Sequence, residues 1–300
     1  MNITKKTLHT NIGGSLLRIV FASVVASLSG ITARADSLWT HVAQDFNWFN
    51  PANWEGDVPS GTNSGTIIIT NGGWATIVGE SASWSGPMRI SGGSRVVPSV
   101  QQGVATSIGA QSIFIGCEDN PELNTNNHFG VSSGWGGDLP ENHIWVFPSV
   151  TATDVYVGQG AGATGNLFSV AEVTLNNLYV GAAGNVGNIA GFINSSISIG
   201  TLHVASGNML SFAPSLADNF DDLWSLISGG QIGELYVDDT LVTADNITTL
   251  FTLDDSNGTL AIFTAVAAAA VPEASTWAAF AGLALLAWAA LHRGRHGRRS

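Results

Sequence analysis

One short motif recurs through the chain at a nearly constant interval. Its copies read Leu178-Tyr179-Val180, Leu202-His203-Val204 and Leu235-Tyr236-Val237, with weaker copies at Ile113-Phe114-Ile115 and Val155-Tyr156-Val157. The steps from Val157 to Val180 and from Val180 to Val204 are nearly equal. A step of roughly 20–25 residues is typical of one turn of a parallel β-solenoid, where each unit buries its apolar face only against its neighbours.

The alternation within each motif indicates β-strands. Because successive side chains point to opposite faces, Leu178 and Val180 are expected inside and Tyr179 outside. Gly-Asn pairs, which tolerate the positive φ of sharp corners, separate the copies; they are Gly165-Asn166, Gly184-Asn185, Gly187-Asn188 and Gly207-Asn208. We predict an all-β body over residues 36–270, built as a parallel β-solenoid. A β-sandwich with irregular hairpins remains the alternative.

Two intervals are longer than the others. One runs from Val204 to Val237, and its excess, from Ser215 to Ser228, has apolar residues at helical spacing and ends at a glycine. It predicts one amphipathic helix over about 215–228. The other runs from Ile115 to Val157, and its polar segment Glu118–Ser149 predicts a long surface loop.

The N-terminus has the pattern of a secretory signal peptide. Lys5 and Lys6 precede an apolar stretch, Ile19–Ile31, and Ala33 and Ala35 are the small residues that a signal peptidase requires. We expect residues 1–35 to be removed by cleavage after Ala35.

The C-terminus predicts a membrane anchor. Val271-Pro272-Glu273 precedes an uncharged run, 275–291, which predicts a short transmembrane helix. The tail that follows contains four arginines, which predict that this side stays in the cytoplasm; they are Arg293, Arg295, Arg298 and Arg299. The body would then lie outside the inner membrane.

The body is strongly anionic. Residues 36–271 contain 21 acidic residues and only two cationic ones, Arg89 and Arg95, for a formal charge of −19. Such a surface is repelled by phosphate backbones, so nucleic acid is excluded as a partner.

Both ends of the body resemble known families. Asn53-Trp54, with Gly56, Pro59 and a strand at Thr66–Ile69, resembles the opening unit of autotransporter-like, repeat-containing β-solenoid surface proteins. Three tryptophans there, Trp39, Trp48 and Trp54, are predicted to cap the exposed end of the solenoid, with a sugar-stacking platform as the alternative.

Residues 271–300 resemble the PEP-CTERM sorting domain, with Ala274 in place of the usual second proline. The resemblance implies recognition by an exosortase in the inner membrane and processing near Pro272 and Glu273, in bacteria that make extracellular polysaccharide.

No catalytic or metal-binding pattern stands out in the body. Four histidines are too scattered for a ligand pair; they are His41, His128, His143 and His203. Cys117 is the single cysteine, so it forms no intramolecular disulfide, and we expect a half-buried, inert thiol. No cofactor is expected. Acidic turns leave Ca²⁺ open without assigned ligands; they are Glu118-Asp119-Asn120, Asp238-Asp239 and Asp254–Gly258.

These features predict an exported, non-catalytic protein of the cell surface or the exopolysaccharide matrix, with a structural or adhesive role. It would be handled by the secretion machinery and an exosortase, and anchored in the inner membrane before its release. A carbohydrate-binding protein is the alternative, using tryptophans such as Trp135 and Trp145. An enzyme that acts on glycans is the third hypothesis. A glycosidase needs only two facing carboxylates, whereas a polysaccharide lyase generally needs basic residues, of which the body has only Arg89 and Arg95.

Overall fold

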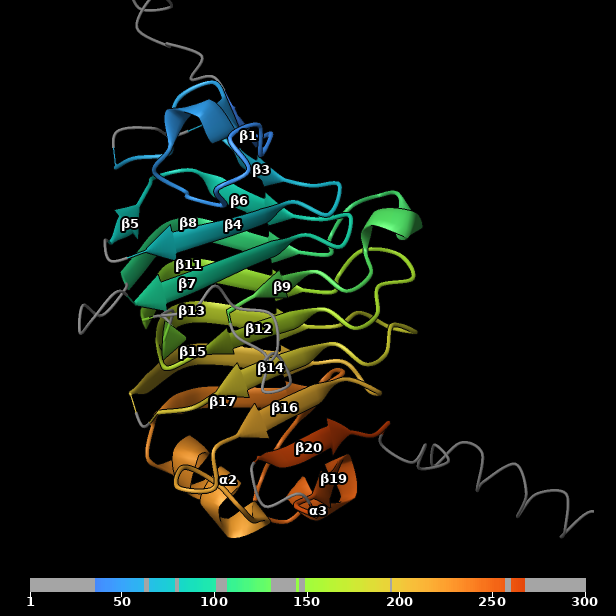
Figure 1. Cartoon of the computed structure of the whole chain (residues 1–300). Coiled ribbons are helices and arrows are strands. Elements are labelled where there is room, and N and C mark those ends of the chain that lie inside the picture. The colour runs from blue at the N-terminus through green and yellow to red at the C-terminus, as the bar shows by residue number, and fades with distance from the viewer. Residues whose placement is uncertain are drawn as a thin grey trace, which may run out of the picture.

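The computed structural model describes residues 36–61, 65–78, 81–100, 107–130, 144–145, 149–194, 196–256 and 260–267. The predicted signal peptide with Ala33 and Ala35 lies outside these ranges, as does the predicted sorting segment from Val271 onward. Within them the chain is mostly β-strand, which confirms the all-β prediction. The strands stack along one long axis, from β1 at the upper end to β20 at the lower end (Figure 1).

The strands belong to two sheets. The strands of the first sheet are β1 (Ser37–Trp39), β2 (Trp54–Glu55), β3 (Ile67–Ile69), β5 (Ala82–Ser83), β6 (Pro87–Ile90), β8 (Ser107–Ile115), β11 (Ser149–Val157), β13 (Glu172–Val180), β15 (Ile197–Val204), β17 (Ile232–Val237) and β18 (Thr240–Leu241). Those of the second sheet are β4 (Trp74–Val78), β7 (Arg95–Val100), β9 (His128–Phe129), β10 (Ile144–Trp145), β12 (Leu167–Val170), β14 (Ile189–Phe192), β16 (Met209–Phe212), β19 (Phe251–Asp254) and β20 (Ala261–Ala265).

The chain alternates between the two sheets. From β11 to β17, strands of the first and the second sheet alternate along the chain. The last of these connections, between β16 and β17, is longer and carries α2. Successive strands of the same sheet pair in parallel, so that β11, β13, β15 and β17 are neighbours in one sheet and β12, β14 and β16 in the other. We call one strand of the first sheet with the next strand of the second a repeat unit.

The strand register follows the sequence repeat residue by residue. Val157 is opposite Val180, Val180 is opposite Val204, and Val204 is opposite Val237. Their side chains are buried, as are those of Leu178, Leu202 and Leu235. The second sheet contributes phenylalanines to the same core; Phe129, Phe168, Phe192, Phe212 and Phe263 are fully buried. The predicted alternation is therefore confirmed.

A column of buried asparagines joins successive units at one corner. Asn127, Asn166, Asn188 and Asn208 have no exposed surface. Each of the first three donates from its amide nitrogen to the amide oxygen of the next, at 2.9, 2.8 and 2.8 Å. The same oxygens also accept backbone N–H groups. We call this column the asparagine ladder. It satisfies polar groups that would be costly to bury unpaired.

Glycines make room for the asparagine ladder. Gly116, Gly158 and Gly181 follow strands of the first sheet and have φ of +64° to +73°. A β-carbon at these positions would lie 2.4, 2.3 and 2.0 Å from the amide groups of Asn166, Asn188 and Asn208. Both the backbone and the available space therefore require glycine.

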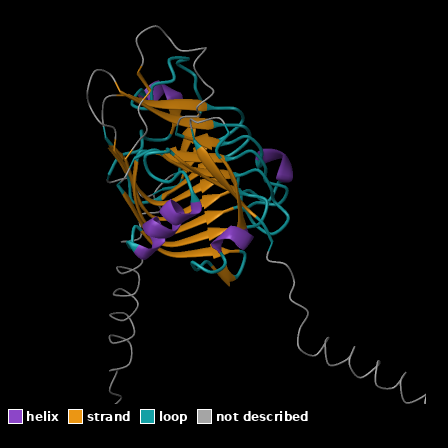
Figure 2. Ribbon diagram, turned by 90° about the horizontal axis from the view of Figure 1, so that it is seen from below, coloured by secondary structure: helices purple, strands orange, loops and turns teal. Residues whose placement is uncertain are grey.

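Both ends of the stack change from parallel to antiparallel pairing. At the upper end β2 pairs antiparallel with β1, and at the lower end β18 pairs with β17 and β20 with β16. Helix α2 (Phe220–Ser228) and the short α3 (Ile247–Leu250) lie at this lower end (Figures 1 and 2). Two 3₁₀ turns, η1 (Pro51–Asn53) and η2 (Pro121–Leu123), lie in connections. The parallel stacking of the first sheet therefore ends at β1 and at β17, and that of the second sheet ends at β16.

The predicted helix exists but begins later than expected, at Phe220 instead of Ser215. Asn219 has an extended backbone and its side chain accepts the N–H of Asp222 at 2.9 Å, which makes it the N-cap. Residues before it form turns, in which Leu216 and Ala217 donate to the carbonyl of Ala213. Helix α2 buries Leu223 and Leu226, and Phe220 packs edge-on against Phe263 of β20.

Asn219→Ala is expected to lower the free energy of unfolding by about 1 kcal/mol, because the N–H of Asp222 loses its acceptor. Asn219→Ser restores an acceptor at the cap and is the control. Urea unfolding followed by circular dichroism measures both variants, and equal losses would contradict the capping role.

The predicted loop Glu118–Ser149 is only partly a loop. Its first part includes η2 and β9, and β9 pairs in parallel with β7 and β12. Phe129 of β9 is fully buried, and Asn124 and Asn127 are buried beside it. These residues complete a repeat unit, so the prediction of one continuous surface loop from Glu118 is wrong. Residues 144–145 form β10, and 131–143 and 146–148 lie outside the described residues.

Candidate functional site

The register aligns five outward-facing rings on the first sheet. Neighbouring rings have centroids 4.8 to 4.9 Å apart and planes within 3° to 12°; they belong to Phe114, Tyr156, Tyr179, His203 and Tyr236. We call this row the outer ring ladder. At its upper end the guanidinium of Arg89 lies 4.9 Å from the centroid of Phe114, which continues the row as a cation–π contact.

Stacking determines which part of each ring meets solvent. The flat faces of the inner rings cover one another, so ring edges, phenol hydroxyls and the imidazole nitrogens form the outer surface. Each aromatic pair contributes about 0.5–1.5 kcal/mol beyond the area that it buries. The rings therefore stabilise the stack and also present polar groups at a regular spacing.

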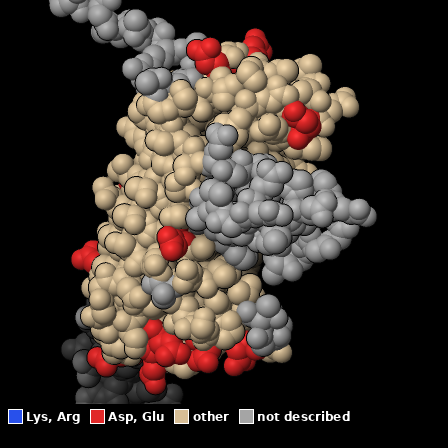
Figure 3. Space-filling view, turned by 60° about the vertical axis from the view of Figure 1, so that its left-hand side comes forward, with Lys and Arg blue, Asp and Glu red and all other residues tan. Residues whose placement is uncertain are grey.

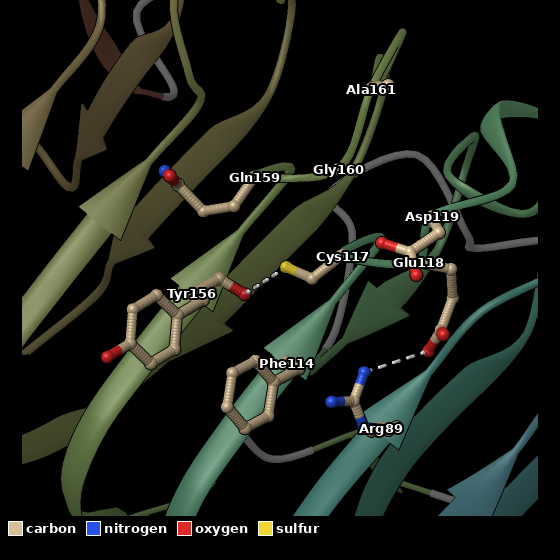
Figure 4. A pocket seen from close by; sticks show the side chains of 9 residues that line it. All are labelled: Arg89, Phe114, Cys117, Glu118, Asp119, Tyr156, Gln159, Gly160 and Ala161. Atoms are coloured by element: carbon tan, nitrogen blue, oxygen red, sulfur yellow. Dashed lines mark hydrogen bonds and ion pairs between the residues drawn. The ribbon is translucent and has the colours of Figure 1, made fainter.

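Two hollows lie beside the outer ring ladder. The first, of about 340 Å³, is lined by Arg89, Phe114, Glu118, Asp119, Tyr156 and Gln159, among others (Figure 4). The second, of about 240 Å³, includes Tyr179, His203, Asp238 and Asp239. Gln159 lines both hollows. Together they follow the ladder over four of its rings, and we call them the ladder groove.

The polar groups of the first hollow are held in place by one another. Arg89 donates to a carboxylate oxygen of Glu118 at 3.4 Å. Gln159 donates from its amide to the carbonyl of Gly181 in the next unit. The thiol of Cys117 donates to the carbonyls of Ile115 and Tyr156 at 3.4 and 3.5 Å (Figure 4). Burial raises the pKa of this thiol, so it stays protonated at neutral pH and is a poor nucleophile. The prediction of a half-buried thiol is confirmed.

The ladder tends to keep its rings uncharged. Burial raises the pKa of Tyr156, and the neighbouring carboxylate of Asp154 adds to the shift. A hydrogen bond to Glu234 raises the pKa of Tyr236. Burial lowers the pKa of His203, although Asp239 and Glu234 act in the opposite direction. The strand position predicted for His203, in line with Tyr179 and Tyr236, is confirmed.

The tryptophans at the upper end form a cap. Trp39, Trp48 and Trp54 are 4%, 0% and 6% exposed. Trp54 packs edge-on against both others, at 5.0 and 4.8 Å, and Trp48 stacks on Trp84 at 5.6 Å. These rings are covered by protein, so the alternative of a sugar-stacking platform at this end is wrong. Trp135 lies outside the described residues, and only the backbone of Trp145 is described.

The remaining candidate residues are dispersed. His41 packs against Phe46 at the upper end, His128 is in β9, and His143 lies outside the described residues. Arg95 lies 5.6 Å from the ring centroid of Trp74. Among the described residues, no three His, Cys, Asp or Glu side chains form a group that could hold a metal ion.

No helix in the described part of the chain is both long and apolar enough to cross a bilayer. The segment 275–291 lies outside that part, so the predicted span stays a prediction, as do the processing residues Val271, Pro272 and Glu273 and the four C-terminal arginines.

His128 is expected to make stability depend on pH. Burial, with a further contribution from Arg95, lowers its pKa from 6.5 to about 4. As the pH falls from 6.5 to about 4, His128 takes up a proton in the unfolded chain but not in the folded chain. Stability is therefore lost with acidification. We expect a loss of about 2 kcal/mol, since partial exposure screens the full shift.

The chain with His128→Gln should lack this part of the pH dependence. The measurement is the difference in free energy of unfolding between the two chains at pH 7.5 and at pH 4, which cancels the titration of the carboxylates they share. A difference that does not change with pH would assign the effect to other groups.

Two features of the site region were not predicted from the sequence. Arg89 occupies the ladder position in a unit without an aromatic residue, so the repeat did not reveal it. The Gly-Asn context of Asn166, Asn188 and Asn208 predicts only turn residues. They recur at nearly equal steps along the chain, and this periodicity was the available signal for the asparagine ladder.

No family model matches the chain, and the comparisons with curated proteins and with solved structures found no match either.

Proposed function

We propose that this chain is an exported, non-catalytic protein of the cell surface or exopolysaccharide matrix, whose β-solenoid body has a structural or adhesive role. The observation that carries the proposal is that the polar and aromatic side chains of the repeat contact their equivalents in neighbouring units. In the described units, the asparagine ladder and the outer ring ladder direct these side chains toward neighbouring units. A regular, self-bonded stack suits a spacer or scaffold.

The solenoid is favoured over the β-sandwich by the direction of the strands. A sandwich is built from antiparallel sheets with hairpin or Greek-key connections. Here the long strands β8, β11, β13, β15 and β17 pair in parallel, and the chain passes to the other sheet between them. Antiparallel pairs occur at the ends of the stack and where β10 joins β7.

The charge of the molecule favours a body that stays soluble and apart from other anionic surfaces. Acidic side chains gather at the lower end of the face in Figure 3, where α2 lies. On the described surface Arg89 and Arg95 are both engaged by neighbouring aromatic rings. We propose that the PEP-CTERM-like segment directs the chain to an exosortase and that the anionic body keeps it soluble after release.

Mass spectrometry of the chain from fractionated cells tests this proposal. We expect the mature protein to begin at Asp36, to end near Pro272 and Glu273, and to be found in the extracellular or matrix fraction. A Pro272→Ala, Glu273→Gln chain should keep its tail and remain in the inner membrane. The same double exchange made elsewhere, at Pro214 and Glu172, is the matched control and should be sorted normally. An intact chain in the cytosol would refute the proposal.

A further inference from the structure

The ladder groove is the strongest candidate for a binding site in the described part of the chain. Its floor is made of ring edges and its side is made of corner residues that follow β8, β11, β13, β15 and β17. Glu118, Asp119, Asp238 and Asp239 place carboxylates along it. We infer that the ladder groove binds a linear polysaccharide whose sugar units carry free amines. This inference rests on the proposed role in the matrix and names its ligand class.

The spacing of the groove suits a polysaccharide better than a peptide. Equivalent polar edges of Tyr156, Tyr179 and His203 recur every 4.9 Å along the stack. A β-1,4-linked hexose unit advances by a similar length and is turned over relative to its neighbours, so every second sugar would present the same edge at every second ring. An extended peptide presents side chains to one face only every 6.6 Å or so, about twice its rise per residue, and falls out of step with the rings.

The charge of the groove selects the kind of polysaccharide. Glu118 is paired with Arg89, whereas Asp119 and Asp239 are exposed, and Asp238 accepts the N–H of Ser206 at 3.0 Å. A sugar ammonium group would form charge-assisted hydrogen bonds with these carboxylates, which are stronger than neutral ones. Polyuronates and nucleic acids would be repelled by the same carboxylates and by the anionic body.

Each of the two hollows would hold the same length of polysaccharide. The first adjoins Phe114 and Tyr156 and the second adjoins Tyr179 and His203, so each spans two rings. Gln159 lies between them and bonds to the carbonyl of Gly181. Two sugars would fit along each hollow, with an amine of each pair directed to Asp119 or to Asp238 and Asp239.

Calorimetric titration of the full chain in an uncharged detergent tests the inference. The probes are the β-1,4-linked glucosamine hexamer, its N-acetylated counterpart and a galacturonate hexamer. We expect the glucosamine hexamer to bind at least about tenfold more tightly than the N-acetylated one, and the galacturonate hexamer not to bind. Equal affinity for the two amino-sugar hexamers, or no binding of the glucosamine hexamer, would overturn the inference.

Matched triple variants separate a built site from general charge attraction. Asp119→Asn, Asp238→Asn, Asp239→Asn should weaken binding of the glucosamine hexamer about tenfold or more. Glu172→Gln, Asp245→Asn, Asp255→Asn changes the net charge equally at exposed acids outside the groove and should change the affinity by less than about twofold. Equal effects of the two sets would overturn the inference. Since purified protein is used, this result is independent of where cells place the chain.

Discussion

Asn188→Ala is expected to lower the free energy of unfolding by about 4 kcal/mol, one of the two largest effects that we predict, because several buried groups lose their partners together. Asn188 lies in the middle of the asparagine ladder with no exposed surface. Its amide oxygen accepts from the backbone and side-chain nitrogens of Asn166, at 3.3 and 2.8 Å. Its amide nitrogen donates to Asn208 and to the carbonyl of Ala163, at 2.8 and 3.2 Å.

The size of this effect comes from the groups left behind. Alanine would leave two donors of Asn166 and the carbonyl of Ala163 unpaired in the interior, at about 1–3 kcal/mol for each unsatisfied group. The neighbouring bonds of the ladder would weaken as well, since such bonds polarise one another.

Asn177→Ala is the matched control for this prediction. Asn177 also bonds to the unit before it, donating to Asp154 at 2.7 Å, but on the partly exposed outer face. We expect a loss below about 1 kcal/mol, because water replaces the lost partner. Equilibrium unfolding in urea, followed by far-ultraviolet circular dichroism, measures both chains. Similar losses of unfolding free energy in the two variants would show that the buried asparagine ladder stabilises the fold no more than an exposed bond does.

Gly181→Ala is expected to cost at least about 3 kcal/mol, although it adds a single methyl group, because a steric clash adds to backbone strain. The new β-carbon would lie 2.0 Å from the amide nitrogen of Asn208 and 2.3 Å from its amide carbon. Asn208 would have to move, and it would lose bonds to the carbonyls of Asn185 and Ala205 and to the amide of Asn188. The φ of +73° adds strain of about 1–2 kcal/mol for a residue with a β-carbon.

Gly184→Ala separates the strain from the clash. Gly184 has a φ of +83°, but a β-carbon there would meet nothing within 4 Å. Its cost should therefore be the backbone strain alone, about 1–2 kcal/mol. A double-mutant cycle with Asn208→Ala adds a second check, because Gly181→Ala should cost less once the amide group is gone. If Gly181→Ala and Gly184→Ala cost the same, the steric argument is wrong.

The regular units of the fold could be predicted from the sequence because their signal is local. Each motif alternates apolar and polar residues, and the copies recur at almost constant intervals, so the register from Val157 to Val237 followed from alignment. The upper units were harder to recognise. There Ile68 and Arg89 occupy the ladder positions. The connection between β8 and β11 is also longer, because it contains η2 and, after β9, the stretch that carries β10.

The candidate site was predicted only in part. The outward position of the rings was expected, but their parallel stacking and the hollows beside them depend on the twist and the corner connections of neighbouring strands. The asparagines show the same limit. Asn166 has the sequence context of a turn residue, and it is buried because Asn127 and Asn188, distant from it in the sequence, bond to it. Helix α2 began late because Asn219 caps it, and the apolar spacing extends beyond the cap.

In-register pairing has a consequence for how such a chain can change in length. Residues 159–181 have the length of one whole unit, and their removal would join Gly158 to Ala182, the residue that Gly181 now precedes. Both ladders would remain continuous, because Tyr156 would then stack on His203 and Asn127 would bond to Asn188. Duplication of the same block would add one rung to each ladder. The height of the molecule can thus be adjusted in steps of about 4.8 Å, the spacing of neighbouring strands, while its cross-section and both capped ends stay the same.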